Sequence, residues 1–238
     1  MNTVLFDLDG TLLPMDQDHY IAAYLKMLGE RFAADYDPVA LREAILRGTG
    51  AMIQNDGGRT NETCFWQVFS AALGEGVLGR KADFDDFYRE RYNDLRSEAG
   101  FTPLAAETVR ALKEKGYTLI LASNPLYPEI ATRARMRWAG LREEDFLLVT
   151  AYEKFSYCKP NVSYYREILA MCGLKPQDCL MVGNDAEEDL CAAEIGLDVW
   201  LLTDCLINRQ NRDISSHRHS TLAEFRAEVN SWRKVTDM

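Results

Sequence analysis

The stretch Val4-Leu5-Phe6-Asp7-Leu8-Asp9-Gly10-Thr11-Leu12 opens with an apolar run, places two aspartates on alternate positions and then reaches a glycine. We expect the apolar run to form a β-strand. Because side chains alternate along a strand, Asp7 and Asp9 then point the same way where the strand ends. Gly10 permits a tight turn whose backbone N–H groups can face an anion.

Two carboxylates on one side of a strand repel each other, and a cation between them removes that cost. A divalent metal beside a carboxylate nucleophile is an arrangement for phosphoryl transfer. The alternative is a strand end with an Asx turn, for which aspartate and glycine are ordinary residues.

The composition predicts a globular protein with room for a main domain and a smaller one. The chain has 238 residues, of which 47% are hydrophobic and 27% are charged. Its formal net charge of -10 argues against non-specific nucleic-acid binding, which needs a basic surface. An anionic small substrate stays compatible with this charge, because a bound metal can outweigh the global sign.

The six cysteines are scattered without a CxxC pair, so the sequence predicts free thiols and a reducing cytoplasm. The first strand begins almost at Met1, which leaves no room for a secretory signal. No apolar run approaches the length of a membrane span. We therefore expect a cytoplasmic protein without a membrane partner. The sequence does not specify an oligomeric state. The cysteines are Cys64, Cys158, Cys172, Cys179, Cys191 and Cys205.

Two segments differ in their periodicity. Residues 15–100 carry apolar stripes at helical spacing and no run typical of a buried strand, so we expect a separate helical module there. Later residues alternate strand-like and helix-like runs, which predicts a parallel sheet covered on both faces. Such sheets bind ligands at the carboxyl ends of their strands. The expected strands are 117–122, 146–149, 179–183 and 199–202, and the expected helices are 103–115, a helix ending near 138, 162–172, a short helix ending at 195, and 222–232.

Polar residues follow these expected strands. Ser123-Asn124 comes after the second strand, Cys158-Lys159-Pro160 precedes a helix, and the segment 183–189 places an acid cluster after the fourth strand. Each has an ordinary alternative: turn chemistry, a solvated lysine, and favourable charges at a helix N-terminus. Their order, each at or just after a strand end, is what random turns would rarely produce.

This set of motifs resembles the haloacid dehalogenase superfamily of phosphatases and phosphotransferases. Asp7-Leu8-Asp9-Gly10-Thr11 is similar to its first motif, Ser123-Asn124 to its second, Lys159-Pro160 to its third, and the pair Asp185 and Asp189 to its fourth. The resemblance implies an α/β fold with a Rossmann-like parallel core of residues 1–14 and 101–238. Residues 15–100 then form a helical cap. Asn161 and Asn184 depart from the residues common in the family, aspartate and glycine, without changing a catalytic residue type.

The resemblance also implies roles for the carboxylates. Asp7 attacks phosphorus and forms an aspartyl-phosphate, and Asp9 acts as general acid and then as general base. The Asp7 carboxylate, the Asp9 backbone carbonyl and Asp185 hold Mg²⁺. Asp189 orients the site without touching the metal.

The phosphoryl oxygens, by the same resemblance, are bound by Lys159, Ser123, Asn124 and backbone amides around Gly10. Four acids in one small volume require Mg²⁺ and Lys159 to balance their charge. The implied activity is a Mg²⁺-dependent phosphatase acting on a small phosphorylated metabolite, with no nucleic-acid partner. Asp9 favours phosphate esters, because the dehalogenases of this superfamily carry no acid there.

Two alternatives stay open. His19 follows Asp9 by ten residues, where mutase-like relatives carry a histidine, so a sugar-phosphate mutase or other phosphotransferase is one alternative. A non-catalytic binding module on the same fold is the other.

Substrate choice is expected in the cap, with Arg47, Arg59 and the loop 55–59 as candidates and a solvated helix face as their alternative. We expect an aromatic trio in the cap to form core, and a histidine pair near residue 218 to lie in a surface loop. The trio is Phe65, Trp66 and Phe69, and the pair is His217 and His219.

Overall fold

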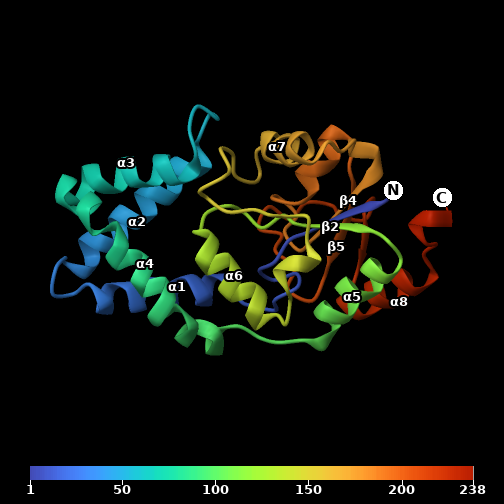
Figure 1. Ribbon diagram of the computed structural model, residues 1–238, viewed down its shortest axis with the longest axis horizontal. Helices are drawn as coiled ribbons and strands as arrows, with labels where there is room; N and C mark the ends of the chain where they lie inside the picture. Colours follow the sequence, from blue (N-terminus) through green and yellow to red (C-terminus); the bar gives the residue numbers. More distant parts are fainter. Residues whose placement is uncertain (238) are drawn as a thin grey trace.

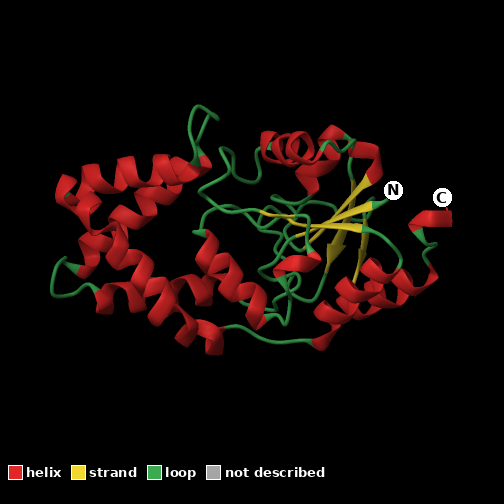
Figure 2. Ribbon diagram, viewed as in Figure 1, coloured by secondary structure: helices red, strands yellow, loops and turns green. Residues whose placement is uncertain are grey.

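The structure is a computed structural model that describes residues 1–237. A parallel sheet lies at its centre with the strand order β3-β2-β1-β4-β5-β6 (Figure 2). The first strand sits between β2 and β4, so that Leu5 is paired with both Ile120 and Met181. The parallel sheet predicted from the sequence is confirmed. The strands are β1 (Thr3–Phe6), β2 (Thr118–Leu121), β3 (Leu148–Val149), β4 (Cys179–Gly183), β5 (Asp198–Leu202) and β6 (Arg218–Ser220).

Helices cover the sheet in two layers (Figure 1), and alternate residues of the central strand pack into different clusters. Val4 and Phe6 pack into a cluster with residues of α5 (Pro103–Glu114), α6 (Glu129–Trp138) and α8 (Leu222–Ser231). Leu5 packs on the other side, against α7 (Val162–Cys172) and the 3₁₀ segment η5 (Leu190–Ile195). Both faces of the sheet are therefore covered, which explains why its strands are apolar throughout. Three further 3₁₀ turns of this part are η3 (Glu143–Asp145), η4 (Pro176–Asp178) and η6 (Val235–Asp237).

Local sequence signals fix the ends of these helices. Thr102 accepts a hydrogen bond from the Leu104 backbone N–H and caps α5, whose first residue is Pro103. Thr221 and Glu224 form a reciprocal capping box at the start of α8. Gly173 ends α7 with a φ of 65°, a left-handed conformation that favours glycine.

The segment between the first two motifs is helical, as predicted. Its helices gather on one side of the sheet, opposite the two chain termini (Figure 1). Aromatic rings fill their interior, with the Phe32 and Phe84 rings stacked at 4.2 Å between centroids. The elements are α1 (Gln17–Arg31), α2 (Pro38–Ile53), α3 (Asn61–Leu73), η1 (Glu75–Arg80), α4 (Lys81–Glu90) and η2 (Tyr92–Glu98).

Three expected elements differ from the structure. The strand predicted at 146–149 keeps only Leu148–Val149, because Phe146 caps the turn η3. The short helix after the fourth motif is a 3₁₀ segment, preceded by a turn that the Asp185 carboxylate binds. His219 does not lie in a loop: it pairs with Leu201 as part of the short edge strand β6. An exposed, charged edge of this kind also protects a sheet from pairing with other chains.

Two further expectations concern the cysteines and the membrane. All six cysteine side chains are free thiols, as the sequence predicts. Within residues 1–237, the helices are too short or too polar to cross a bilayer.

Candidate active site

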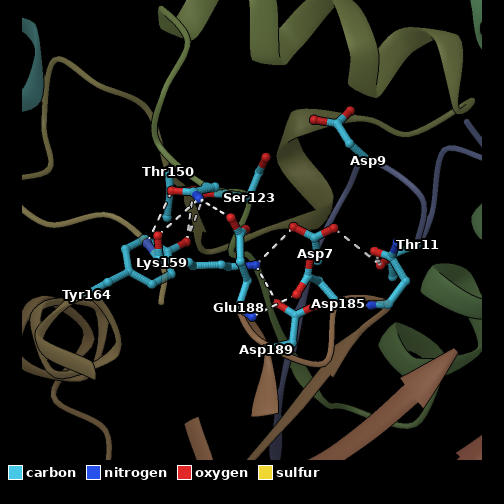
Figure 3. Close-up of polar contacts among 12 residues, drawn as sticks. Asp7, Asp9, Thr11, Ser123, Thr150, Lys159, Tyr164, Asp185, Glu188 and Asp189 are labelled. Carbon is cyan, nitrogen blue, oxygen red and sulfur yellow. Dashed lines mark hydrogen bonds and ion pairs between the residues drawn. The ribbon is translucent and has the colours of Figure 1, made fainter. Parts of the chain in front are cut away.

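The carboxyl ends of β1, β2 and β4 meet around one cavity. It receives both aspartates of the first motif, Ser123 and Asn124 of the second, and the acids of the fourth (Figure 3). Residues of α1 close it from the other side. The convergence predicted from the strand ends is therefore present. The lining residues are Asp7, Asp9, Met15, Gln17, Tyr20, Ile21, Ser123, Asn124, Leu126, Tyr127, Asn184, Asp185, Glu188 and Asp189.

Lys159 is the cation that contacts two acids of this cavity, Asp7 and Asp189 (Figure 3). Its side chain is fully buried, and its Nζ donates to Asp7 Oδ1 at 2.9 Å and to Asp189 Oδ1 at 2.7 Å. Burial lowers the pKa of Lys159, but Asp189 and Asp7 outweigh that effect and hold the pKa well above its usual value. The Asn124 amide oxygen accepts from the Lys159 backbone N–H at 3.2 Å, which joins the second and third motifs. Lys159 is thus a permanently charged, rigidly held group rather than a solvated lysine.

Asp7 lies between two donors. Lys159 binds one carboxylate oxygen, and the Thr11 hydroxyl lies 3.2 Å from the other. Burial raises the pKa of Asp7 to about 7, while Lys159 lowers it and Asp189 raises it further. The side chain is held in one orientation and faces a cavity, which is the arrangement that a carboxylate nucleophile needs.

Asp9 also lines the cavity, but a different cation binds it. Its carboxylate lies 3.1 Å from Nε of Arg135, a residue of α6 whose side chain is fully buried. Arg135 also donates to the Tyr92 hydroxyl at 2.8 Å and lies 4.2 Å from the Tyr127 ring centroid. Burial raises the pKa of Asp9, and Arg135 acts against that rise. Figure 3 shows Asp9 apart from the group formed by Asp7, Lys159 and Asp189.

Gly10 holds the turn after β1. Its φ is 87°, and a Cβ built there would lie 2.3 Å from the Asn184 side chain. Its backbone N–H donates to the Leu13 carbonyl at 2.7 Å. The role of this amide in binding the phosphoryl group stays a prediction.

The fourth motif folds around Asp189. Its Oδ2 accepts from the backbone N–H groups of Asn184 and Asp185, both at 3.0 Å, while Oδ1 holds Lys159. Asp185 Oδ1 in turn accepts from the N–H groups of Glu187 and Glu188 at 2.7 and 2.9 Å. Asp189 thus organises the turn that presents Asp185 to the cavity.

Glu188 is a further site residue that the sequence did not single out from its acidic neighbours. Its carboxylate accepts from Asn124 Nδ2 at 3.0 Å and lines the cavity. Burial raises its pKa to about 8, with Lys159 lowering it and Asp189 raising it. The contact with Asn124 orients the amide of the second motif. In the sequence, Glu188 is only one of four acids in the run Asp185-Ala186-Glu187-Glu188-Asp189, and nothing there distinguishes it from the others.

Gly183 leaves no space beside Asp189, so replacing it with alanine is expected to displace this carboxylate. An added Cβ would lie 2.0 Å from Asp189 Oδ2, which the backbone N–H groups of Asn184 and Asp185 hold in place. Overpacking of this kind costs about 1–3 kcal/mol, which corresponds to roughly 2–12 °C in the midpoint of thermal unfolding. The matched control is Gly79→Ala, where a Cβ would meet no atom within 4 Å. Equal melting temperatures for both variants would contradict the expectation.

The donor set fits a hard divalent cation. The Asp7 and Asp185 carboxylates line the same cavity. Within residues 1–237, no group of three His, Cys, Asp or Glu side chains could hold a metal ion. The protein ligands would therefore be these two carboxylates and one main-chain oxygen, that of Asp9, which also accepts from Gln17 Nε2 at 3.1 Å. An all-oxygen set completed by water suits Mg²⁺. The acids that line the cavity outnumber the two buried cations beside them, Lys159 and Arg135, so added positive charge is favourable there.

The side chains predicted to select substrate, Arg47 and Arg59, do not line this cavity. Arg47 lies 3.9 Å from Glu43 on the surface of α2, and Arg59 donates to Gln67. The loop 55–59 is tied to Tyr157, whose hydroxyl donates to the Asp56 carbonyl. His19, the residue that suggested a mutase, lies 2.8 Å from Glu98 and is 65% exposed.

Comparisons with known proteins agree with this geometry. The family model for haloacid dehalogenase-like hydrolases matches residues 1–195. The chain is 25% identical over 190 residues to the pyrophosphatase PpaX of Bacillus cereus, covering 78% of this chain and 75% of that protein. It is 27% identical over 201 residues to a phosphoglycolate phosphatase of Vibrio vulnificus, covering 84% and 82%.

Solved structures share the fold. A HAD phosphatase from Thermococcus onnurineus superposes with a TM-score of 0.60 at 19% identity, covering 99% of this chain and 100% of that one. A 2-haloacid dehalogenase from Pseudomonas syringae gives a TM-score of 0.62 at 18% identity, with 97% and 98% covered. The resemblance stated from the motifs is confirmed: this chain belongs to the haloacid dehalogenase-like hydrolase family.

Proposed function

We propose that the protein is a Mg²⁺-dependent phosphatase that hydrolyses a small phosphorylated metabolite through an aspartyl-phosphate on Asp7. The observation that carries this proposal is the buried Lys159, which binds Asp7 and Asp189, two acids that line the cavity. A cation at this position can bind a phosphoryl oxygen beside the nucleophile. Two groups of relatives named as phosphatases support the same reaction class.

In the first step Asp7 attacks phosphorus, and the bond to the leaving alcohol breaks. Lys159 and Thr11 orient the Asp7 carboxylate, while Lys159, Ser123 and Asn124 bind the oxygens of the phosphoryl group. Ser123 is held by its carbonyl, which accepts from the Thr150 hydroxyl at 2.5 Å and from the Tyr164 hydroxyl at 2.9 Å. Its position at the end of β2 is thereby fixed.

Asp9 transfers the protons in both steps. It protonates the leaving oxygen, and then it takes a proton from the water that hydrolyses the aspartyl-phosphate. Burial raises the pKa of Asp9, which favours the protonated form that the first step requires. Its contact with Arg135 holds the side chain beside the cavity but away from Asp7. Asp9 therefore keeps its own environment although it is two residues from the nucleophile.

Asp7, Asp185 and the Asp9 backbone carbonyl would hold the cation. When bound there, Mg²⁺ would neutralise charge on the phosphoryl oxygens. Asp189 would act on the site by holding Lys159 and the backbone of Asp185. This division gives each acid of the first and fourth motifs a distinct role.

The helical segment 15–100 is proposed as a cap domain over a core formed by 1–14 and 101–238. Gln17, Tyr20 and Ile21 of α1 line the cavity opposite the strand ends. The organic part of the substrate then lies between α1 and the sheet. Free thiols and the acidic net charge fit a cytoplasmic protein that does not bind nucleic acid.

Replacing Asp9 with asparagine is expected to separate the two chemical steps. For an alkyl phosphate, kcat falls by roughly 10²–10⁴-fold, because a poor leaving group needs protonation. For an aryl phosphate, the first equivalent of aryl alcohol is still released as a burst, followed by slow turnover. Rapid-mixing kinetics with both esters measures this difference. Loss of turnover with both esters and without a burst would refute the role of Asp9 in proton transfer.

The proposed activity is tested by phosphate release from a panel of phosphorylated metabolites and a generic aryl phosphate. A metal-free sample and the Asp7→Asn variant serve as controls. Release that disappears in both controls supports the phosphatase. Folded protein that binds Mg²⁺ without releasing phosphate would overturn the phosphatase proposal. Conversion to an isomeric ester would then indicate a mutase, although His19 faces Glu98 rather than the cavity.

A further inference from the structure

A second cavity adjoins the candidate active site. It lies between the inserted helices and the loop after β2, and its walls are mainly aromatic. Its volume is about 70 Å³, room for roughly five water-sized groups. Phe65, Trp66 and Phe69 were expected to form only the core of the cap, and they also line this cavity. The other lining residues are Tyr24, Leu28, Ile45, Thr49, Phe84, Asp85, Tyr88, Leu126, Tyr127, Pro128 and Tyr152.

The two cavities have a common wall. Leu126 and Tyr127 line both of them. Tyr127 follows Asn124, a predicted phosphoryl-binding residue, by three positions, so their Cα atoms are at most about 11 Å apart. A substrate whose phosphoryl group lies at Asp7 can therefore extend its organic part past Tyr127 into the second cavity.

The charge of the second cavity is negative and uncompensated. Asp85 carries the only charge among its lining residues, and within residues 1–237 its carboxylate forms no side-chain hydrogen bond or ion pair. Three of the wall hydroxyls have partners, since Tyr24 bonds Tyr88 at 2.7 Å and Tyr152 accepts from Trp66 Nε1 at 3.4 Å. The cavity thus offers a ligand mainly aromatic rings and the Asp85 carboxylate, together with the hydroxyls of Thr49 and Tyr127.

Aromatic rings beside a carboxylate bind ammonium groups, because the ring faces are electronegative and the acid supplies the opposite charge. One wall already shows this preference. The Lys81 ammonium lies 5.6 Å from the Trp66 ring centroid, although its charge is neutralised by Glu62. An anionic leaving group would instead meet Asp85 without any cation in the lining, which costs binding energy.

We propose that the substrate is the phosphate monoester of a short amino alcohol, whose ammonium group binds in the aromatic cavity beside Asp85. This inference rests on the proposed phosphatase activity and specifies its substrate class. The proposal predicts a preference for a cationic leaving group. The substrates named for the relatives, pyrophosphate and phosphoglycolate, both have anionic leaving groups.

The test compares esters of similar shape and different charge. The probes are phosphocholine and phosphoethanolamine, the neutral isostere 3,3-dimethylbutyl phosphate, and phosphoglycolate. We expect kcat/KM for phosphocholine or phosphoethanolamine to exceed that of the neutral ester by roughly 10- to 30-fold. Phosphoglycolate is expected to be the poorest of the four. A neutral or anionic ester that equals or exceeds both cationic ones would overturn the proposal.

Variants locate the effect. Asp85→Asn should reduce the ratio of kcat/KM between phosphocholine and its neutral isostere by about tenfold. The matched control is Asp86→Asn, because Asp86 is the next residue, pairs with Arg89 at 2.7 Å and does not line the cavity. This control should leave the ratio unchanged. A ratio that is the same in Asp85→Asn and in the wild type would contradict the assignment.

Binding provides a readout that does not need turnover. Calorimetric titration of the Asp7→Asn protein with phosphocholine should show binding that weakens when Asp85→Asn is added. If Asp85→Asn weakens phosphocholine binding but no ester is hydrolysed, including the aryl phosphate, then the phosphatase proposal fails and the ammonium site stands. If esters are hydrolysed and Asp85→Asn does not weaken binding, the ammonium site fails and the phosphatase stands.

Discussion

The Asp7→Asn protein is expected to lose phosphate release by roughly 10⁴-fold or more, because the attacking carboxylate is replaced by a poorly nucleophilic amide. The substitution keeps the shape of the side chain. Lys159 keeps its contact with Asp189, so the buried cation is not left alone. Burial raises the pKa of Asp7 to about 7, which means that an uncharged group is tolerated at this position. The variant should therefore fold, and its loss of activity is chemical.

Steady-state phosphate release and thermal unfolding, measured on the same samples, check this result. A melting temperature equal to or above that of the wild type is expected together with the loss of activity. Turnover within tenfold of the wild type would exclude Asp7 as the nucleophile. It would leave a water molecule or another acid of the cavity in that role.

The Lys159→Met protein is expected to be much less stable. Methionine fills a similar volume but leaves Asp7 and Asp189 buried without their shared cation. Removing one partner of a buried ion pair costs about 3–5 kcal/mol, which corresponds to roughly 6–20 °C in the melting temperature of a chain this long. Adding Asp189→Asn should restore part of the loss, because one of the two uncompensated charges disappears. Metal-free samples are used, so that a bound cation does not replace the missing ammonium.

The loss should also depend on pH in a defined direction. Without Lys159, which lowers the pKa of Asp7, the pKa of this buried acid lies further above its value in the unfolded chain. Below its folded-state pKa a carboxyl group of this kind is protonated. The free energy of unfolding then falls as pH rises through that pKa, because the buried group must ionise. The stability difference from the wild type is therefore larger at pH 8 than at pH 5. A difference that is independent of pH, or no rescue by Asp189→Asn, would contradict the ionic role of Lys159.

The sequence predicted the parts of the site that follow from strand ends. A buried apolar strand followed by Asp7, a turn carrying Ser123 and Asn124, and the acids from Asp185 onward meet because parallel strands end at one edge. Periodicity also separated the helical segment from the α/β part, since a run without strand character cannot extend the sheet.

Other parts depend on tertiary contacts that no local pattern encodes. Arg135 is one of three arginines on α6, and only the packing against Tyr92 and Tyr127 shows that it is buried beside Asp9. The hydrogen bond from the Gly10 amide to Leu13 is likewise not encoded in its motif. The edge strand β6 was missed because its exposed residues carry no alternation of polar and apolar side chains.

The central claim, covalent catalysis by Asp7, is tested most directly by trapping the intermediate. The enzyme is mixed with Mg²⁺ and a rapidly cleaved aryl phosphate, quenched during the first turnover and reduced with borohydride. This treatment converts an acyl phosphate to an alcohol, and peptide mass spectrometry then locates it. We expect homoserine at position 7 in the Asp9→Asn protein, in which the intermediate persists. Burst release of aryl alcohol without modification of Asp7, or with modification at Asp185 or Asp189, would contradict the account.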